Sequence, residues 1–231
     1  MTENKNIIAI DGPSGSGKGT LRRALCEHYR FAGLDTGSLY RAITLYLIRH
    51  GYDMDHIDPS ETARVARGIS ASHEILEYAA DPDVRSMEVS LYVAIVATNP
   101  ELRRAIRQYQ IDFGRNPPPL PDGMTARGAV IEGRDIGTVI FPDAPVKIYI
   151  TATPEVKARR RYDEYVGLGI KASYDEILAN MLRRDELDSK RDRDAGQLSI
   201  ASDAVVIDTS DMTREQVAAA AIRIADERLP K

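Results

Sequence analysis

Residues 12–20 read GPSGSGKGT, and they follow directly on the apolar run IIAID at residues 7–11. A short β-branched run that closes on a glycine-rich loop, followed by an amphipathic segment from Leu21, predicts a strand, a phosphate-binding loop and a helix. Glycines allow the backbone N–H groups of such a loop to turn toward oxyanions, and Lys18 adds a full positive charge. We therefore expect these residues to bind the phosphates of a nucleotide.

The residue after the lysine departs from the strict pattern of such loops, which has Ser or Thr at that position. Here Gly19 follows Lys18, and Thr20 comes one residue later. The pattern GKGT resembles the nucleoside monophosphate kinases more than the GTPases, and it leaves open whether a hydroxyl contacts Mg²⁺ directly. The alternative, a glycine-rich turn that binds no ligand, is disfavoured because a strand precedes the loop and a helix follows it.

The composition limits the classes of protein to which the chain can belong. The 231 residues suffice for one α/β domain with insertions, and a net charge of −4 gives no general electrostatic reason to bind nucleic acid or an anionic membrane. Most basic residues are arginines, which bind phosphate in a bidentate manner, so local anion sites are expected. The single cysteine, Cys26, and the lack of a long apolar run or secretory pattern predict a soluble cytoplasmic protein, which we expect to be monomeric.

Four apolar runs predict a mostly parallel sheet with helices on both faces. They lie at residues 7–11, 128–131, 145–151 and 204–208, and stretches with helical periodicity separate them. In such sheets ligands bind at the carboxyl ends of the strands. Asp11, the glycine-rich loop and residues 132–135 all follow strand ends, so we expect them at one edge of the sheet.

Periodicity and capping residues predict the helices between these strands. Leu34 is expected to begin a short turn that leads into a helix, and Thr213 to cap the last helix with Gln216 three residues later. Further helices are expected at about 60–65, 86–98, 100–113, 154–169 and 174–190. The last two carry many charges and are joined by a glycine-containing hinge, a pattern equally typical of a mobile flap and of a solvated helical hairpin. The proline-rich stretch 115–123 is interpreted as a stiff surface loop rather than a ligand for a partner.

Several motifs occur together in the order and spacing of the bacterial cytidylate kinases. They are IDGPSGSGKGT, LDTGSLYR, EGRDIGTVIFPDAPVKIYITA, ARRR and RRDELDSKR, and the stretch GRDIGTVIFPDAP is the most specific. The chain resembles this family over most of its length, most weakly at about 51–85. The resemblance implies one α/β domain over 1–231, a P-loop core with a five-stranded parallel sheet flanked by helices. It also implies a monophosphate-binding insert at about 38–115 and a helical lid at about 154–191.

The same resemblance implies the activity and its residues. The activity would be ATP-dependent phosphorylation of CMP and dCMP to CDP and dCDP by direct in-line transfer, with Mg²⁺ accompanying ATP. The implied ATP-binding residues are Gly12, Pro13, Ser14, Gly15, Ser16, Gly17, Lys18, Gly19, Thr20 and Arg160. The implied acceptor-binding residues are Thr36, Tyr40, Arg41, Arg103, Arg134, Asp135, Arg184, Asp188 and Arg191. Lys18, Arg134, Arg160, Arg184 and Arg191 are the implied catalytic residues.

The sequence also departs from the family pattern. Glu132 stands where the family usually has Asp, Leu187 where an Arg often occurs, and Ala94 near a position that is often a base-contacting Ser. The insert is shorter than in many members, so we expect its small β element to be absent or reduced. No direct metal ligand is assigned. Two alternatives stay open on the sequence: a P-loop kinase with another acceptor such as UMP, and a non-catalytic module that senses nucleotides.

Overall fold

The structure is a computed structural model, and it describes residues 6–72, 74–167, 169–190 and 198–230, with the backbone alone at 184 and 187–190. The chain divides into two compact units. Unit 1 comprises Met1–Leu34, Gly114–Arg191 and Gln197–Lys231, and unit 2 comprises Asp35–Phe113 and Asp192–Gly196. Each unit is described by itself below.

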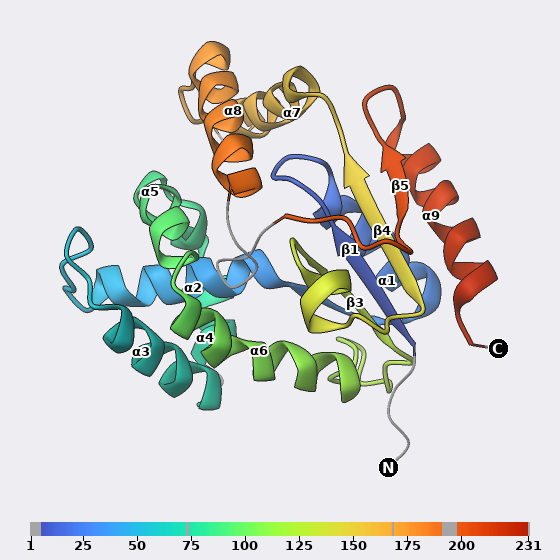
Figure 1. The fold of residues 1–231 in the computed structure, drawn as a ribbon, viewed down its shortest axis with the longest axis horizontal. Coiled ribbons are helices and arrows are strands. Elements are labelled where there is room, and N and C mark those ends of the chain that lie inside the picture. Colours follow the sequence, from blue (N-terminus) through green and yellow to red (C-terminus); the bar gives the residue numbers. More distant parts are fainter. Residues whose placement is uncertain (1–5, 73, 168, 191–197, 231) are drawn as a thin grey trace. The chain divides into compact units, whose positions relative to one another are not determined.

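Unit 1 is built on a five-stranded parallel sheet, which confirms the predicted fold class (Figure 1). The strand order is β2-β3-β1-β4-β5, with the bounds β1 Ile7–Asp11, β2 Ala32–Asp35, β3 Ala129–Gly133, β4 Val146–Thr151 and β5 Val205–Asp208. In β1 and β3 every residue is buried. Both faces of these central strands are therefore covered, which is why they read as continuous apolar runs rather than as alternating ones.

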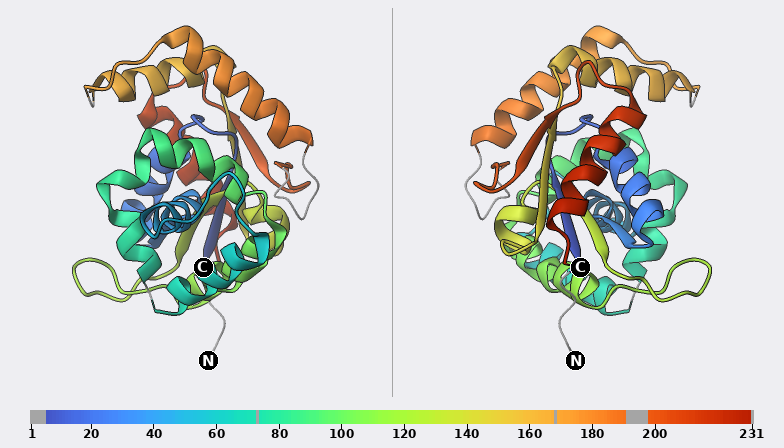
Figure 2. Two further views of the ribbon diagram at one scale, coloured as in Figure 1. Left: turned by 90° about the vertical axis from the view of Figure 1, so that its left-hand side faces the viewer. Right: turned by 90° about the vertical axis from the view of Figure 1, so that its right-hand side faces the viewer.

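Helices α1 (Lys18–Tyr29) and α9 (Arg214–Arg228) lie side by side against one face of this sheet (Figure 2). The core on this face comes from the sheet and both helices, with Ile8, Ile10, Leu21, Leu25, Val130, Val146, Ile148, Ile150, Ile207, Val217, Ala221 and Ala225 among its members. The predicted cap of α9 is confirmed, since Thr213 and Gln216 form a capping box. The remaining helices of unit 1, α7 (Pro154–Gly167) and α8 (Tyr174–Lys190), contact each other.

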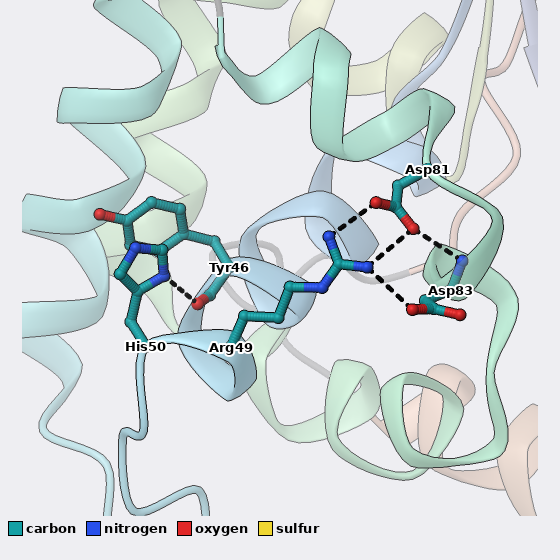
Figure 3. A network of polar contacts seen from close by, with 5 residues as sticks. All are labelled: Tyr46, Arg49, His50, Asp81 and Asp83. Atoms are coloured by element: carbon teal, nitrogen blue, oxygen red, sulfur yellow. Dashed lines mark hydrogen bonds and ion pairs between the residues drawn. The ribbon is translucent and has the colours of Figure 1, made fainter.

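Unit 2 consists of helices arranged around α2 (Thr36–Arg49). They are α3 Pro59–Ala71, α4 Glu74–Ala80, the 3₁₀ turn η1 Pro82–Arg85, α5 Met87–Val96 and α6 Pro100–Arg115, whose last two residues belong to unit 1. Within the described part of 36–113 no strand is present. Arg49 on α2 binds Asp81 and Asp83 with its guanidinium, while Tyr46 stacks on His50 at 3.8 Å (Figure 3). The Arg49 contacts hold η1 against α2.

Three local expectations need correction, and two elements were not predicted. Leu34 lies in β2 rather than in a turn; the segment AGLD has no β-branched residue, and its Ala32 N–H bonds to Gly128 O at 2.9 Å. The helix expected at 60–65 continues to Ala71, and the one expected at 154–169 ends at Gly167, because Gly169 adopts φ +72°. Helix α4 and a π-helical turn η2 at Ile136–Ile140 were not predicted. Among the described residues no helix is both long and apolar enough to cross a membrane.

Candidate active site

The loop that follows β1 adopts a backbone shape that requires glycine. Gly12, Gly15 and Gly17 have φ values of +152°, +81° and +99°. A Cβ atom on Gly12 would lie 2.1 Å from the carbonyl oxygen of Ile150 in β4. Gly17 also precedes α1 without a capping side chain, which is the arrangement in which an anion can cap a helix. The loop therefore has the cradle shape expected for phosphate binding.

Lys18, the first residue of α1, reaches back across this loop. Its Nζ atom donates to Gly12 O and Pro13 O, both at 2.7 Å. Ser16 Oγ donates to Pro13 O at 2.9 Å, which tightens the same turn. The ammonium group is thus held over the loop by two carbonyl oxygens, and a stronger acceptor such as a phosphate oxygen can replace them.

Arg160 on α7 joins the loop to the segment after β5. Its Nη1 donates to Ser16 O at 3.2 Å and to Thr209 Oγ1 at 3.0 Å, and its Nη2 donates to Thr209 O at 2.8 Å. Thr209 is buried and donates in turn to Thr151 O at 2.9 Å. Burial of this guanidinium lowers the pKa of Arg160. Thr209 was not among the predicted site residues, although its place directly after a strand end was a usable signal.

A second contact to the loop comes from the α7–α8 hairpin. Lys157 on α7 is buried and forms an ion pair with Asp185 on α8. A Cβ atom on Gly15 would lie 3.2 Å from both Lys157 Cβ and Met181 Cε. Lys157 and Met181 therefore lie directly against the loop, and a side chain at position 15 would displace them.

The neighbouring arginines of α7 contact the hairpin itself. Arg159 lies over the ring of Tyr174 at 4.8 Å and over that of Tyr162 at 5.6 Å. Arg161 forms an ion pair with Glu164 at 2.9 Å. Ala158, Ile177 and Met181 give the hairpin a small core of its own. The side chains of Arg159 and Arg161 are thus bound within the hairpin.

The carboxyl end of β3 carries the acidic residues expected at this edge. Glu132 is buried, and its Oε1 lies 3.4 Å from Arg22 Nε. Asp135 is buried directly before η2, and Arg134 lies next to it in the chain. Asp11, at the end of β1, accepts hydrogen bonds from the backbone of η2. Burial raises the pKa of Asp11 to about 6.

The predicted acceptor residues of unit 2 lie on and around α2. Arg41 Nη1 donates to Ser90 Oγ at 3.0 Å and to Val84 O at 3.3 Å. The guanidinium of Arg103 lies 5.3 Å from the ring centre of Tyr40, a cation–π distance. Thr36, the first residue of α2, is buried. The hydrogen bond between Arg41 and Ser90 was not predictable from local sequence, because it joins two different helices, α2 and α5.

Three predicted residues cannot be placed at the side-chain level. Arg184 and Asp188 belong to α8, where the structure describes only their backbone, and Arg191 lies outside the described residues. No group of three or more His, Cys, Asp or Glu residues that could hold a metal ion occurs in the described part of the chain. Magnesium bound with ATP takes most of its ligands from phosphate and water. The loop amides and Lys18 are hydrogen-bond donors, so they suit the phosphate oxygens of a nucleotide.

A family model and individual known proteins, compared with this chain, point to the same family. A family model described as cytidylate kinase matches residues 8–227. Cytidylate kinase of Mesorhizobium japonicum is 41% identical over 231 residues, covering 97% of this chain and 95% of that protein. Cytidylate kinase of Corynebacterium efficiens is 42% identical, covering 98% and 96%, and that of Parabacteroides distasonis is 41% identical, covering 92% and 93%. A phosphate-binding loop at the carboxyl edge of a five-stranded parallel sheet, together with these matches over nearly the whole length, shows that the chain belongs to the cytidylate kinase family.

Proposed function

We propose that this protein transfers the γ-phosphoryl group of ATP to CMP and dCMP, giving ADP with CDP or dCDP. The observation that carries the proposal is the glycine cradle with Lys18 across it, in a chain of the cytidylate kinase family. Such a transfer needs no protein nucleophile, because an oxygen of the acceptor phosphate attacks the γ-phosphorus itself. The protein has to align two charged phosphate groups and stabilise the charge that develops between them.

Residues 12–20 form the donor side of the proposed site. The backbone amides of the loop and the first turn of α1 would bind the β- and γ-phosphates, and Lys18 would exchange its two carbonyl partners for phosphate oxygens. Arg160 already contacts the loop carbonyl of Ser16, which keeps its guanidinium close to the donor. Magnesium bound to the phosphates would neutralise part of their charge. The hydroxyl of Thr20, two residues after Lys18, would be the side-chain group that contacts this metal.

Two further segments of the chain would form the acceptor site and the lid. Arg41, Arg134 and Arg191 would bind the 5′-phosphate of the acceptor, and Thr36 would also contact the acceptor. Tyr40, Arg184 and Asp188 would lie around its sugar. Residues of about 38–115 would form the monophosphate-binding insert. The hairpin at about 154–191 would be the lid that excludes water during transfer and limits the loss of ATP to hydrolysis.

The choice of base follows from hydrogen-bond patterns. Cytosine carries an amino donor at N4 beside acceptors at N3 and O2, whereas uracil carries O4 and an N3–H donor. A carboxylate that accepts from N4 and a guanidinium that donates to the acceptors favour cytosine. Asp135 and Arg103 would have these roles. Ala94 lacks a hydroxyl that could add to the discrimination, so we expect UMP to be a poorer acceptor but not a strictly excluded one.

A coupled assay of ADP release with ATP and a panel of acceptors tests the proposal. CMP and dCMP should give the highest kcat/KM, UMP a clearly lower value, and AMP and GMP almost no turnover. A preference for UMP would overturn the choice of substrate. Nucleotide binding without any turnover would favour a sensing module instead. Sedimentation of the same preparation tests the expected monomer.

A further inference from the structure

Asp11 binds a turn that lies more than a hundred residues further along the chain. It is the last residue of β1 and is 6% exposed. Its Oδ1 accepts from the backbone N–H of Ile136 at 2.9 Å, and its Oδ2 accepts from that of Gly137 at 2.8 Å. These two amides open the π-helical turn η2. Asp135, which precedes η2 as its N-cap, forms no side-chain cap of its own, so Asp11 supplies the cap from a neighbouring strand.

The turn fits this carboxylate closely. A Cβ atom on Gly137 would lie 3.3 Å from Asp11 Oδ2 and 3.2 Å from Lys147 Cδ, so the turn at 137 packs closely against both side chains. The backbone oxygen of Asp135 accepts from Val139 N at 2.9 Å and from Ile140 N at 3.2 Å. The turn that Asp11 caps is thus bonded back to Asp135. The direction of the chain at 134–135 therefore depends on the position of η2.

We propose that Asp11 is a positioning residue for the acceptor site: by capping η2, its carboxylate fixes how Arg134 and Asp135 leave β3. This inference rests on the proposed function, in which Arg134 binds the phosphate of the acceptor and Asp135 its base. The obvious rival role is support of the donor loop, because Asp11 directly precedes Gly12. A role in the acceptor site predicts a change mainly in the KM for CMP, whereas support of the donor loop predicts a change in the KM for ATP as well.

The charges around Asp11 decide its state at neutral pH. Lys18 faces it from α1, Asp135 from the end of β3 and Tyr149 from β4. Burial raises the pKa of Asp11 to about 6 and Asp135 adds to this, while the two amide bonds and Lys18 act in the opposite direction. The carboxylate is therefore ionised at pH 7.5 and accepts from both amides. As the pH falls through about 6, the carboxylate takes up a proton, and the protonated oxygen accepts less well from its backbone N–H.

Asp11→Asn imitates the protonated side chain at every pH, because its amide group keeps one acceptor and replaces the other with a donor. The variant should fold, since a carboxyl group whose pKa is raised by folding destabilises the fold when ionised, and the substitution removes that charge. Asp226→Asn is the matched control. It removes a carboxylate that accepts from Tyr29 Oη at 2.7 Å, between α9 and α1.

The first measurement separates the acceptor from the donor. Asp11→Asn should raise the KM for CMP by about ten- to a hundredfold, the effect of losing a hydrogen bond to a charged group, and change the KM for ATP by less than about threefold. Asp226→Asn should change neither constant. An equal rise of both constants, or no rise in the KM for CMP, would overturn the positioning role.

The second measurement does not depend on activity. Amide hydrogen exchange of the protein without substrates should show Ile136 and Gly137 protected in the wild type and in Asp226→Asn. At least one of the two should exchange about tenfold faster in Asp11→Asn. Unchanged protection would overturn the cap. If the wild type failed to phosphorylate CMP, the proposed function would fail and the positioning role with it, whereas normal wild-type turnover with unchanged protection would overturn the positioning role alone.

The pH dependence supplies a third readout. The phosphate of CMP also titrates near pH 6, so the ratio of kcat/KM for CMP between the wild type and Asp11→Asn is measured, in which this substrate effect cancels. The ratio should be largest above pH 7 and fall toward one below about pH 5.5, as the wild-type carboxyl group takes up its proton. A ratio that stays constant from pH 5 to pH 8 would contradict the role of the ionised carboxylate.

Discussion

Gly12→Ala places a methyl group where the structure has the carbonyl oxygen of Ile150. The new Cβ would lie 2.1 Å from that oxygen, and real Cβ contacts essentially never fall below 3.0 Å. The loop or β4 must therefore move by the difference, about 0.9 Å. A misplacement of about 1 Å in groups that position a substrate lowers rates about 10²-fold. Overlap and the unfavourable φ of +152° together should lower the free energy of unfolding by about 2–5 kcal/mol.

The assay measures kcat and KM for ATP by coupled ADP release, together with urea unfolding. Gly123→Ala is the matched control, because Gly123 has φ +79° but nothing within 4 Å of a Cβ atom. It should lose only about 1–2 kcal/mol of stability from backbone strain and retain the wild-type kcat. If Gly12→Ala kept more than about a third of the wild-type kcat/KM for ATP and unfolded at the same urea concentration as Gly123→Ala, the steric reasoning would be refuted.

Lys18→Ala should lower kcat by about 10²–10³-fold, as loss of one preorganised donor does, and a folded variant with more than a tenth of wild-type kcat would contradict the assignment. Asp135→Ala should narrow the preference for CMP over UMP in kcat/KM by about tenfold, and an unchanged ratio would exclude it from base recognition. Gly68→Ala should raise the free energy of unfolding by about 0.5–1 kcal/mol in urea, because Gly68 lies inside α3 with nothing within 4 Å of a Cβ; a decrease would contradict this. Burial raises the pKa of the Cys26 thiol to about 11, so alkylation by iodoacetamide should be slow at pH 8 and accelerate toward pH 11, whereas a rate at pH 8 equal to that of free cysteine would show that the thiol is accessible.

The parts of the fold that were predictable are those specified by local sequence. The strands at 7–11, 146–151 and 205–208 are apolar runs bounded by turn residues, and the glycine-rich loop identifies itself by its spacing. β2 was missed because its four residues have no strand preference and are ordered by pairing at the sheet edge. The strand preference of the local residues does not predict such a strand, because it is ordered by pairing with a neighbouring strand.

The candidate site was likewise only partly predictable from the sequence. The loop pattern predicted Lys18, and the family resemblance implied Arg41 and Arg134, but neither indicates what these side chains contact. The η2 turn was missed because its cap, Asp11, lies 125 residues earlier in the chain. Thr209 was missed for a similar reason. It contributes to the site through its hydrogen bond with Arg160, and these two residues come together only in the folded chain.

β1 is the first of the five strands to be synthesised. In the sheet, however, it lies between β3 and β4, which comprise residues 129–133 and 146–151. Unit 2 depends mainly on the continuous segment 35–113, whose helices contact one another over short sequence separations. Contacts between nearby residues form faster than pairings across a long loop. The helices of unit 2 can therefore form on the ribosome while β1 is still an unpaired, aggregation-prone segment. The loop after β1 acquires its contact with Ile150 only when β4 has left the exit tunnel, so the ability to bind ATP should arise late in translation.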